Sequence, residues 1–197
     1  MQARSINIIK NREFYWFLGV LCGDGCISGN QTSLQAIDVD FLKRFSKIIK
    51  NITNSSAKIR QIIPKSGNSK ILYIFSVGYK NLSDYLKIKY GSFKTKEWVI
   101  PKEVIDGEFN IKASFFQGLF DSEGGISLNT LKKPIITLTS INKESLKNVN
   151  KMLLESGIHT CYYEREKRAD IIINKKVAIL KFEQLIGFSI ERKRKRL

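Results

Sequence analysis

Hydrophobic positions recur along this chain in two periods, one typical of amphipathic helices and one typical of short strands. Between residues 39 and 51 the apolar positions follow the i, i+3, i+4 spacing of a helix: Phe41, Leu42, Phe45, Ile48 and Ile49. Asn11 is a suitable helix N-cap for a helix that runs to Asp24. Stretches bounded by turn residues predict two strands within 26–37 and one each at 57–64 and 70–77. With a third helix at 81–89, the first half reads helix, two strands, helix, two strands, helix.

The same order of elements recurs in the second half. Helices are expected at 112–123, 143–156 and 176–186, and strands at 125–131, 135–141, 158–166 and 170–174. The match extends to individual residues, because Leu34-Gln35-Ala36-Ile37-Asp38 resembles Leu138-Thr139-Ser140-Ile141-Asn142 at the same point of the order. We therefore predict a tandem duplication, with an N-terminal half at 1–89, a connector packed over the surface at 90–111, and a C-terminal half with a basic tail at 112–197.

Two similar stretches carry the candidate chemistry, FLGVLCGDG at residues 17–25 and FQGLFDSEG at residues 116–124. Each places two small residues four positions apart on one helix face, which would let the two helix backbones approach closely. Each helix is expected to end in an acid, Asp24 or Glu123, followed by a glycine suited to the left-handed conformation. Packed side by side, the helices would bring the two carboxylates together at one end.

Paired carboxylates at helix C-termini repel each other and the helix dipoles. A divalent cation with hard oxygen ligands would relieve this repulsion. The predicted ligands are the carboxylates of Asp24 and Glu123, with Gly23 and Ser122 contributing from the motif backbone. The alternative is that the two acids are only C-terminal residues of an interface helix.

The excess of basic over acidic residues narrows the classes of binding partner. Lys and Arg number 34 against 18 Asp and Glu, so the formal net charge is +16 and the pI is near 9.8. On a folded chain this excess favours a polyanion as partner, most commonly nucleic acid, although a merely soluble basic surface is the alternative. The apolar run 14–22 is too short to span a bilayer, so no membrane partner is expected.

Cysteine usage argues against a zinc site. Cys22 and Cys26 lack the C-x-x-C spacing, no second pair follows, and the chain has a single histidine, His159. We interpret the three cysteines as reduced, mostly buried residues of an intracellular, cytoplasmic protein, with an organelle left open.

Two such halves related by a pseudo-two-fold axis would place eight short strands on one side of the helix pair, as a concave, positive saddle. Lys58 and Arg60 would share one strand face, and Arg165 and Lys167 another. A two-stranded ribbon can enter the DNA major groove and read base edges. The candidate DNA contacts are Lys58, Arg60, Gln35, Thr139, Arg165 and Lys167; the alternative is that they are ordinary solvent-facing positions.

Both motifs and the order of elements resemble the LAGLIDADG homing endonucleases, in the single-chain form that carries two motifs. The resemblance covers roughly residues 13–188. It implies an α+β fold of tandem αββαββα repeats, acting as a monomeric, site-specific endonuclease on double-stranded DNA. It also implies Mg²⁺, with Mn²⁺ as a substitute, held by Asp24 and Glu123. Lys80 and Lys175 would then support the activated water or the charge of the transition state.

Two departures from the family pattern stand out. The sixth motif position is Asp121 in the second copy but Cys22 in the first. The glutamine that many members place at the end of the second strand falls on Ala36 and Ser140. Either the water network is built differently, or the nuclease has decayed into a binder. The alternatives are therefore an intron RNA maturase and a non-catalytic DNA-binding regulator of the same fold.

Overall fold

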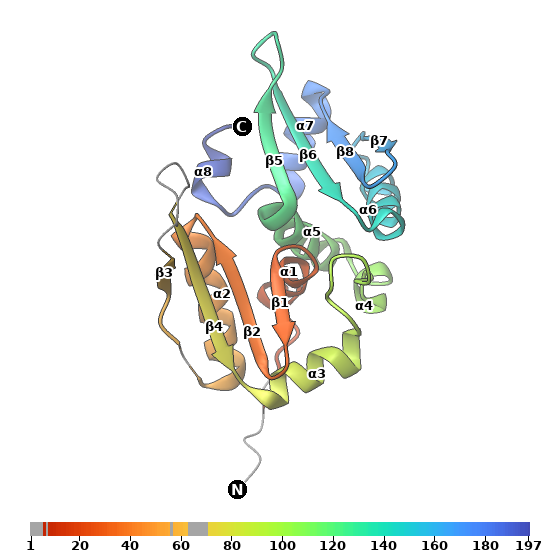
Figure 1. Cartoon of the computed structure of the whole chain (residues 1–197). Coiled ribbons are helices and arrows are strands. Elements are labelled where there is room, and N and C mark those ends of the chain that lie inside the picture. The colour runs from red at the N-terminus through yellow and green to blue at the C-terminus, as the bar shows by residue number, and fades with distance from the viewer. Residues whose placement is uncertain (1–5, 7, 56, 63–70) are drawn as a thin grey trace, which may run out of the picture.

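Two antiparallel four-stranded sheets lie on either side of a central pair of helices in the computed structural model, which describes residues 6, 8–55, 57–62 and 71–197 (Figure 1). The strand orders are β1-β2-β4-β3 and β5-β6-β8-β7, so the two halves have the same topology. Helix α2 lies behind the first sheet, and α6 and α7 lie behind the second (Figure 1). The α+β fold with paired motif helices is therefore confirmed.

The first half begins with a capped helix, because the Asn11 side chain accepts a hydrogen bond from the backbone N–H of Phe14 at 3.1 Å. The tight β1–β2 turn contains Gly29, whose φ of 55° favours glycine. The elements are α1 Arg12–Cys22, β1 Gly25–Ser28, β2 Gln31–Ala36, α2 Val39–Thr53, β3 Arg60–Ile62, β4 Leu72–Gly78 and α3 Lys80–Tyr90. The predicted turn at 66–69 and strand ends at 64 and 70 lie outside the described residues.

The second half repeats this order and its register. Leu34 of β2 pairs with Gly25 of β1, and Leu138 of β6 pairs with Gly124 of β5 in the same way. The elements are α5 Phe109–Glu123, β5 Gly124–Leu128, β6 Pro134–Ser140, α6 Lys143–Glu155, β7 Cys161–Glu164, β8 Ala169–Ile173 and α7 Lys176–Leu185, followed by the short helix α8 Glu191–Arg194. The matching registers confirm the predicted duplication, with several strands shorter than expected.

The helices α1 and α5 touch through their backbones at the centre of the molecule. A Cβ atom on Gly19 would overlap the carbonyl oxygen of Phe115, and one on Gly118 would overlap that of Trp16. Only glycine fits at these two positions, as the spacing of small residues predicts. This contact fixes where the two helices end.

The connector is more than the surface tether that the sequence predicts. Trp98 and Val104 are buried, and the short helix α4 Lys102–Ile105 lies within the segment. The carbonyl oxygen of Trp98 accepts hydrogen bonds from Asn142 Nδ2 and Ser145 Oγ, both at 2.7 Å, at the start of α6. The connector thus belongs to the core, while the exact domain limits stay a prediction. Among the described residues, none of the helices has the length and apolar character that crossing a membrane requires.

Candidate functional site

The two motif acids meet where α1 and α5 end. Glu123 is the last residue of α5, and Asp24 follows α1 by two residues. Both line one open cavity of about 740 Å³. A Cβ atom on Gly23 would overlap the Ser122 side chain, so the two chain segments lie in direct contact here. The sequence prediction that the acids come together is confirmed, and their role as metal ligands stays a prediction.

The glycines after the acids serve close packing and not a left-handed turn. Neither Gly25 nor Gly124 has a positive φ, and each is the first residue of a strand. A Cβ atom on Gly25 would lie 2.7 Å from the Leu21 Cα atom, and one on Gly124 would overlap the carbonyl oxygen of Phe120. The expected left-handed cap is therefore wrong, because each chain passes directly from helix into strand at this point.

The electrostatics of the acid pair favour a cation. Burial and the negative charge of Asp24 together raise the pKa of Glu123 to about 7, against the opposing effect of Lys193. Burial also raises the pKa of Asp24, although its side chain keeps contact with solvent through the cavity. Ionising both acids at once is therefore costly without a neighbouring positive charge.

The donor set fits a divalent cation with an open coordination sphere. Two carboxylates and nearby carbonyl oxygens are hard ligands, and Mg²⁺ commonly takes one or two carboxylates together with water and substrate phosphates. Of the predicted backbone ligands, the Ser122 carbonyl oxygen already lies 3.4 Å from Lys193 Nζ. In the described part of the chain, no group of three or more His, Cys, Asp or Glu side chains could hold a metal. Two carboxylates would leave the rest of the coordination sphere to water and substrate, and the metal site stays a prediction.

The lysines that the family resemblance implicates do not lie with the acids. Strand β1 leaves Asp24 and runs for about 10 Å to Ser28, and β4 ends at the far side of that hairpin, where Gly78 pairs with Gln31. Lys80 follows there, exposed, as the first residue of α3. Antiparallel pairing sends the end of the fourth strand away from the motif, so Lys80 is absent from the cavity lining.

Lys175 has the equivalent position in the second half. Strand β8 ends beyond the pairing of Ile173 with Ile136, and Lys175 then precedes α7. Its Nζ atom lies 3.1 Å from Nε2 of His159. Neither lysine lines the cavity. The structure therefore does not bring either of them to the acid pair.

Two other lysines lie near the acid pair. Lys87 of α3 and Lys94 of the connector line the cavity together with the two acids. Lys94 Nζ lies 3.3 Å from Oε1 of Glu97, a third acid on the cavity wall. Lys87 and Glu97 escape sequence reasoning because only the packing of α3 and of the folded connector brings them to the motif.

Lys193 is the least expected member of the site. It is 6 % exposed, and its Nζ atom donates hydrogen bonds to the carbonyl oxygens of Gly124 at 2.6 Å and Phe120 at 3.0 Å. Burial lowers its pKa to about 8. The basic run 192–196 reads as a solvated tail, so no sequence signal distinguishes this buried lysine from its neighbours.

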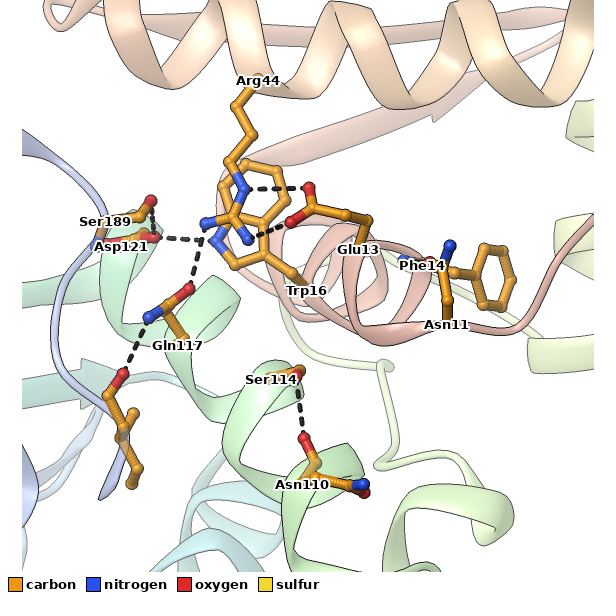
Figure 2. Close-up of polar contacts among 11 residues, drawn as sticks. Asn11, Glu13, Phe14, Trp16, Arg44, Asn110, Ser114, Gln117, Asp121 and Ser189 are labelled. Carbon is orange, nitrogen blue, oxygen red and sulfur yellow. Dashed lines mark hydrogen bonds and ion pairs between the residues drawn. The ribbon is translucent and has the colours of Figure 1, made fainter. Parts of the chain in front are cut away.

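Asp121, at the sixth position of the second motif, is structural. It is 1 % exposed and accepts hydrogen bonds from Trp16 Nε1 at 2.8 Å and from the backbone N–H of Ser189 at 2.8 Å (Figure 2). Arg44 lies 4.1 Å over the Trp16 ring and also donates to the carboxylate of Glu13 (Figure 2). The carboxylate of Asp121 thus ties α1, α5 and the C-terminal segment together.

The first sheet places two candidate DNA contacts in one row. Arg60 of β3 pairs with Ile74 of β4, which pairs with Gln35 of β2, so all three lie on one face of the sheet. Arg60 and Gln35 are exposed. Lys58 is exposed but precedes β3, so its predicted place on that strand is wrong; the regular pairing begins only at Arg60.

The candidate DNA contacts of the second half do not form a comparable row on the sheet. Asp170 accepts a hydrogen bond from Thr139 Oγ1 and one from Arg165 Nε, both at 2.7 Å. Arg165 and Lys167 do not share a strand face as predicted, because β7 ends at Glu164 and both lie in the turn before β8. Lys167 is exposed there. The turn presents basic residues from a hairpin tip.

Comparison with known proteins identifies the fold and the motif. Residues 110–187 match the model of the LAGLIDADG-like domain. The chain is 26 % identical over 184 residues to ribonucleoside-diphosphate reductase NrdEB subunit alpha of Bacillus subtilis, covering 84 % of this chain and 16 % of the relative. It is 25 % identical over 186 residues to a probable translation initiation factor IF-2 of Thermococcus kodakarensis, covering 91 % and 15 %. The chain thus spans less than a fifth of these relatives.

Solved structures share the fold at low identity. The homing endonuclease I-WcaI bound to its DNA recognition sequence matches with a TM-score of 0.68 at 12 % identity, over 95 % of this chain and 88 % of that one. I-DmoI in complex with DNA and Mn matches with 0.60 at 18 %, over 89 % and 96 %. Full-length WhiA from Thermatoga maritima matches with 0.64 at 16 %, over 96 % and 60 %. The second half, residues 110–187, thus matches the LAGLIDADG-like domain, and the whole chain has the fold of the LAGLIDADG homing endonucleases.

Proposed function

We propose that this protein is a metal-dependent, site-specific endonuclease for double-stranded DNA, a homing endonuclease derived from an intron or intein. The observation that carries the proposal is the pairing of Asp24 and Glu123 in one open cavity, where the motif helices of two halves of the same topology end. The net charge of +16 supports a nucleic-acid substrate.

The relatives support an origin as an inserted element. One is named as a reductase subunit and another as a translation factor, and a segment similar to this chain makes up less than a fifth of each. A module that recurs within proteins of unrelated names is expected of a mobile segment. Its substrate then lies inside the cell, in the cytoplasm or an organelle.

The mechanism assigns separate tasks to the residues of the cavity. Asp24 and Glu123 would hold Mg²⁺, or Mn²⁺ in its place, and the bound cation supplies an activated water and charge neutralisation. Glu123 has a pKa of about 7, so it must lose its proton before it can serve as a ligand. Lys94 and Lys87 line the same cavity and would attract the scissile phosphate. Gln35 would contact DNA beside it.

The protein is proposed to act as a monomer on one duplex. Both motif helices belong to one chain, and their contact through Gly19 and Gly118 needs no second copy. The DNA target need not be palindromic, because the two halves differ at equivalent positions. Gln35 is exposed, whereas the Thr139 side chain donates a hydrogen bond to Asp170.

A second candidate is a protein of the same fold that binds DNA or intron RNA without cleaving it. Ala36 and Ser140 replace the glutamine of the family pattern, and Lys80 and Lys175 lie away from the acids. These departures favour a regulator or a maturase over a nuclease.

The deciding experiment selects duplexes from a random DNA library by binding in Ca²⁺ and then tests them for cleavage in Mg²⁺ and Mn²⁺. Asp24→Asn and Glu123→Gln should bind at least as tightly as the wild type, because they relieve carboxylate repulsion, and should lose cleavage by orders of magnitude. Glu155→Gln, an exposed change on α6, is the control. Tight binding by the wild type with no cleavage in any metal would leave the binding function in place of the nuclease.

A further inference from the structure

The C-terminal segment 188–197 is fastened to both halves of the molecule. Ser189 donates hydrogen bonds to Asp121 of α5 through its backbone N–H and its Oγ. Arg192 forms two hydrogen bonds, each of 2.8 Å, to the carboxylate of Asp38, which precedes α2 in the first half. In Figure 1, α8 lies to the left of β5 and above the first sheet. Directly after the second anchor, Lys193 enters the interior.

The Lys193 ammonium group fills a defined position. It donates to the carbonyl oxygens of Gly124 at 2.6 Å, Asp121 at 2.5 Å and Phe120 at 3.0 Å. The last carbonyl groups of a helix lack partners within the helix, and an ammonium group has three N–H donors. Lys193 therefore satisfies the end of α5 at the turn that carries Glu123, and it places a positive charge at the negative end of the helix dipole.

The first motif helix has no counterpart. In the described part of the chain, no lysine or arginine side chain donates a hydrogen bond to the backbone carbonyl groups of residues 19–24, at the end of α1. That end faces the open cavity, whereas Lys193 is absent from the cavity lining. The hydrogen bonds of Lys193 thus reach the end of α5 and not that of α1, although its positive charge also opposes the raised pKa of Asp24.

We propose that Lys193 is a positioning residue: it holds the last turn of α5, and with it the carboxylate of Glu123, in the place where the acid pair binds a divalent cation. The inference rests on the proposed metal site. Because the ammonium group of Lys193 is buried, it cannot contact DNA phosphates. The proposal therefore gives this residue of the basic C-terminal segment a structural role at the metal site. The neighbouring Arg192, equally basic and in the same segment, has no contact with α5 among the hydrogen bonds described.

The test compares Lys193→Met with Arg192→Met in the full chain, because the two changes are adjacent and identical in kind. Mn²⁺ binding is measured by electron paramagnetic resonance, and stability by thermal unfolding in EDTA. Both variants should lose stability, since both loosen the segment. Only Lys193→Met should weaken Mn²⁺ binding, by about tenfold, with less than a twofold change in Arg192→Met. Glu123→Gln should abolish binding at the site.

Several outcomes would overturn the proposal. Equal weakening in both variants would show that Lys193 is only an anchor of the segment. Tighter Mn²⁺ binding in Lys193→Met would show that its charge competes with the metal. No Mn²⁺ binding by the wild type would remove the proposed metal site as well, whereas the first two results spare that site.

If Lys193→Met fails to fold, Lys193→Arg takes its place. A planar guanidinium group spreads its donors over a rigid fork and cannot aim them at three carbonyl oxygens from one point. We expect Lys193→Arg to weaken Mn²⁺ binding more than Arg192→Met does. Binding equal to that of the wild type would refute the positioning role.

Discussion

Replacing Glu123 by glutamine should stabilise the metal-free protein at pH 8 and leave its stability unchanged near pH 4.5. The pKa of Glu123 is raised to about 7 from an ordinary 4.5, by burial and by the charge of Asp24. The folded protein therefore holds this proton more tightly than the unfolded chain. Stability that is fully present below pH 4.5 is lost as the pH rises through 7.

The size of the effect follows from the pKa. Each tenfold change in a dissociation constant corresponds to 1.36 kcal/mol, so the limit for Glu123 is about 3 kcal/mol. Because the side chain is only half-buried, we expect about 1–2 kcal/mol in practice. Glu123→Gln should then exceed the wild type by that amount at pH 8, with the difference developing mainly between pH 5 and 7.

The assay is urea unfolding of both proteins in EDTA at pH 5, 6, 7 and 8. Taking the difference at each pH cancels the titration of groups that the two proteins share. Glu155→Gln, on the exposed face of α6, is the control for the same substitution made away from the acid pair. Adding Mn²⁺ should reverse the order at pH 8, because only the wild type then gains a bound cation. A difference that stays constant from pH 5 to 8 would refute the raised pKa of Glu123.

Three further outcomes are expected. Gly19→Ala should destabilise by about 3 kcal/mol or more in thermal unfolding, since its methyl group would meet a backbone carbonyl of α5, whereas Gly78→Ala, with open space around it, should have little effect. DNA affinity measured by gel shift should fall steeply with salt, and Arg60→Ala should reduce the log–log slope by about one if Arg60 contacts phosphate. Lys94→Met should slow single-turnover cleavage more than Lys80→Met, because Lys94 lines the cavity that holds the acids and Lys80 does not. The reverse order would favour the role that the family resemblance gives to Lys80.

The chain's own sequence determines the repeat and the meeting of the acids. Amphipathic periods and turn residues are local signals, so they place the helices and strands in both halves within a few residues. Small residues at Gly19 and Gly118 permit the helix pair, and that contact brings Asp24 to Glu123. The two repeats can therefore be recognised from local sequence patterns, without knowledge of contacts between distant residues.

Strand ends and turns are decided less locally. The pattern of basic residues at 165 and 167 looks like a strand face, but pairing with β8 stops at Glu164 and leaves both in a turn. Pairing depends on which partner backbone is available and not on side-chain alternation alone. The same holds for Lys58, which precedes the paired residues of β3.

The surroundings of the acids were decided by tertiary structure alone. The antiparallel order carries Lys80 and Lys175 to the ends of the sheets away from the motif, although their sequence positions match the family pattern. The folded connector brings Lys94 to the cavity, and the C-terminal segment buries Lys193 against the end of α5. The sequence alone does not show whether a lysine is exposed or buried. A lysine is buried only where carbonyl groups far away in the sequence converge on its ammonium group, because their hydrogen bonds offset the loss of hydration.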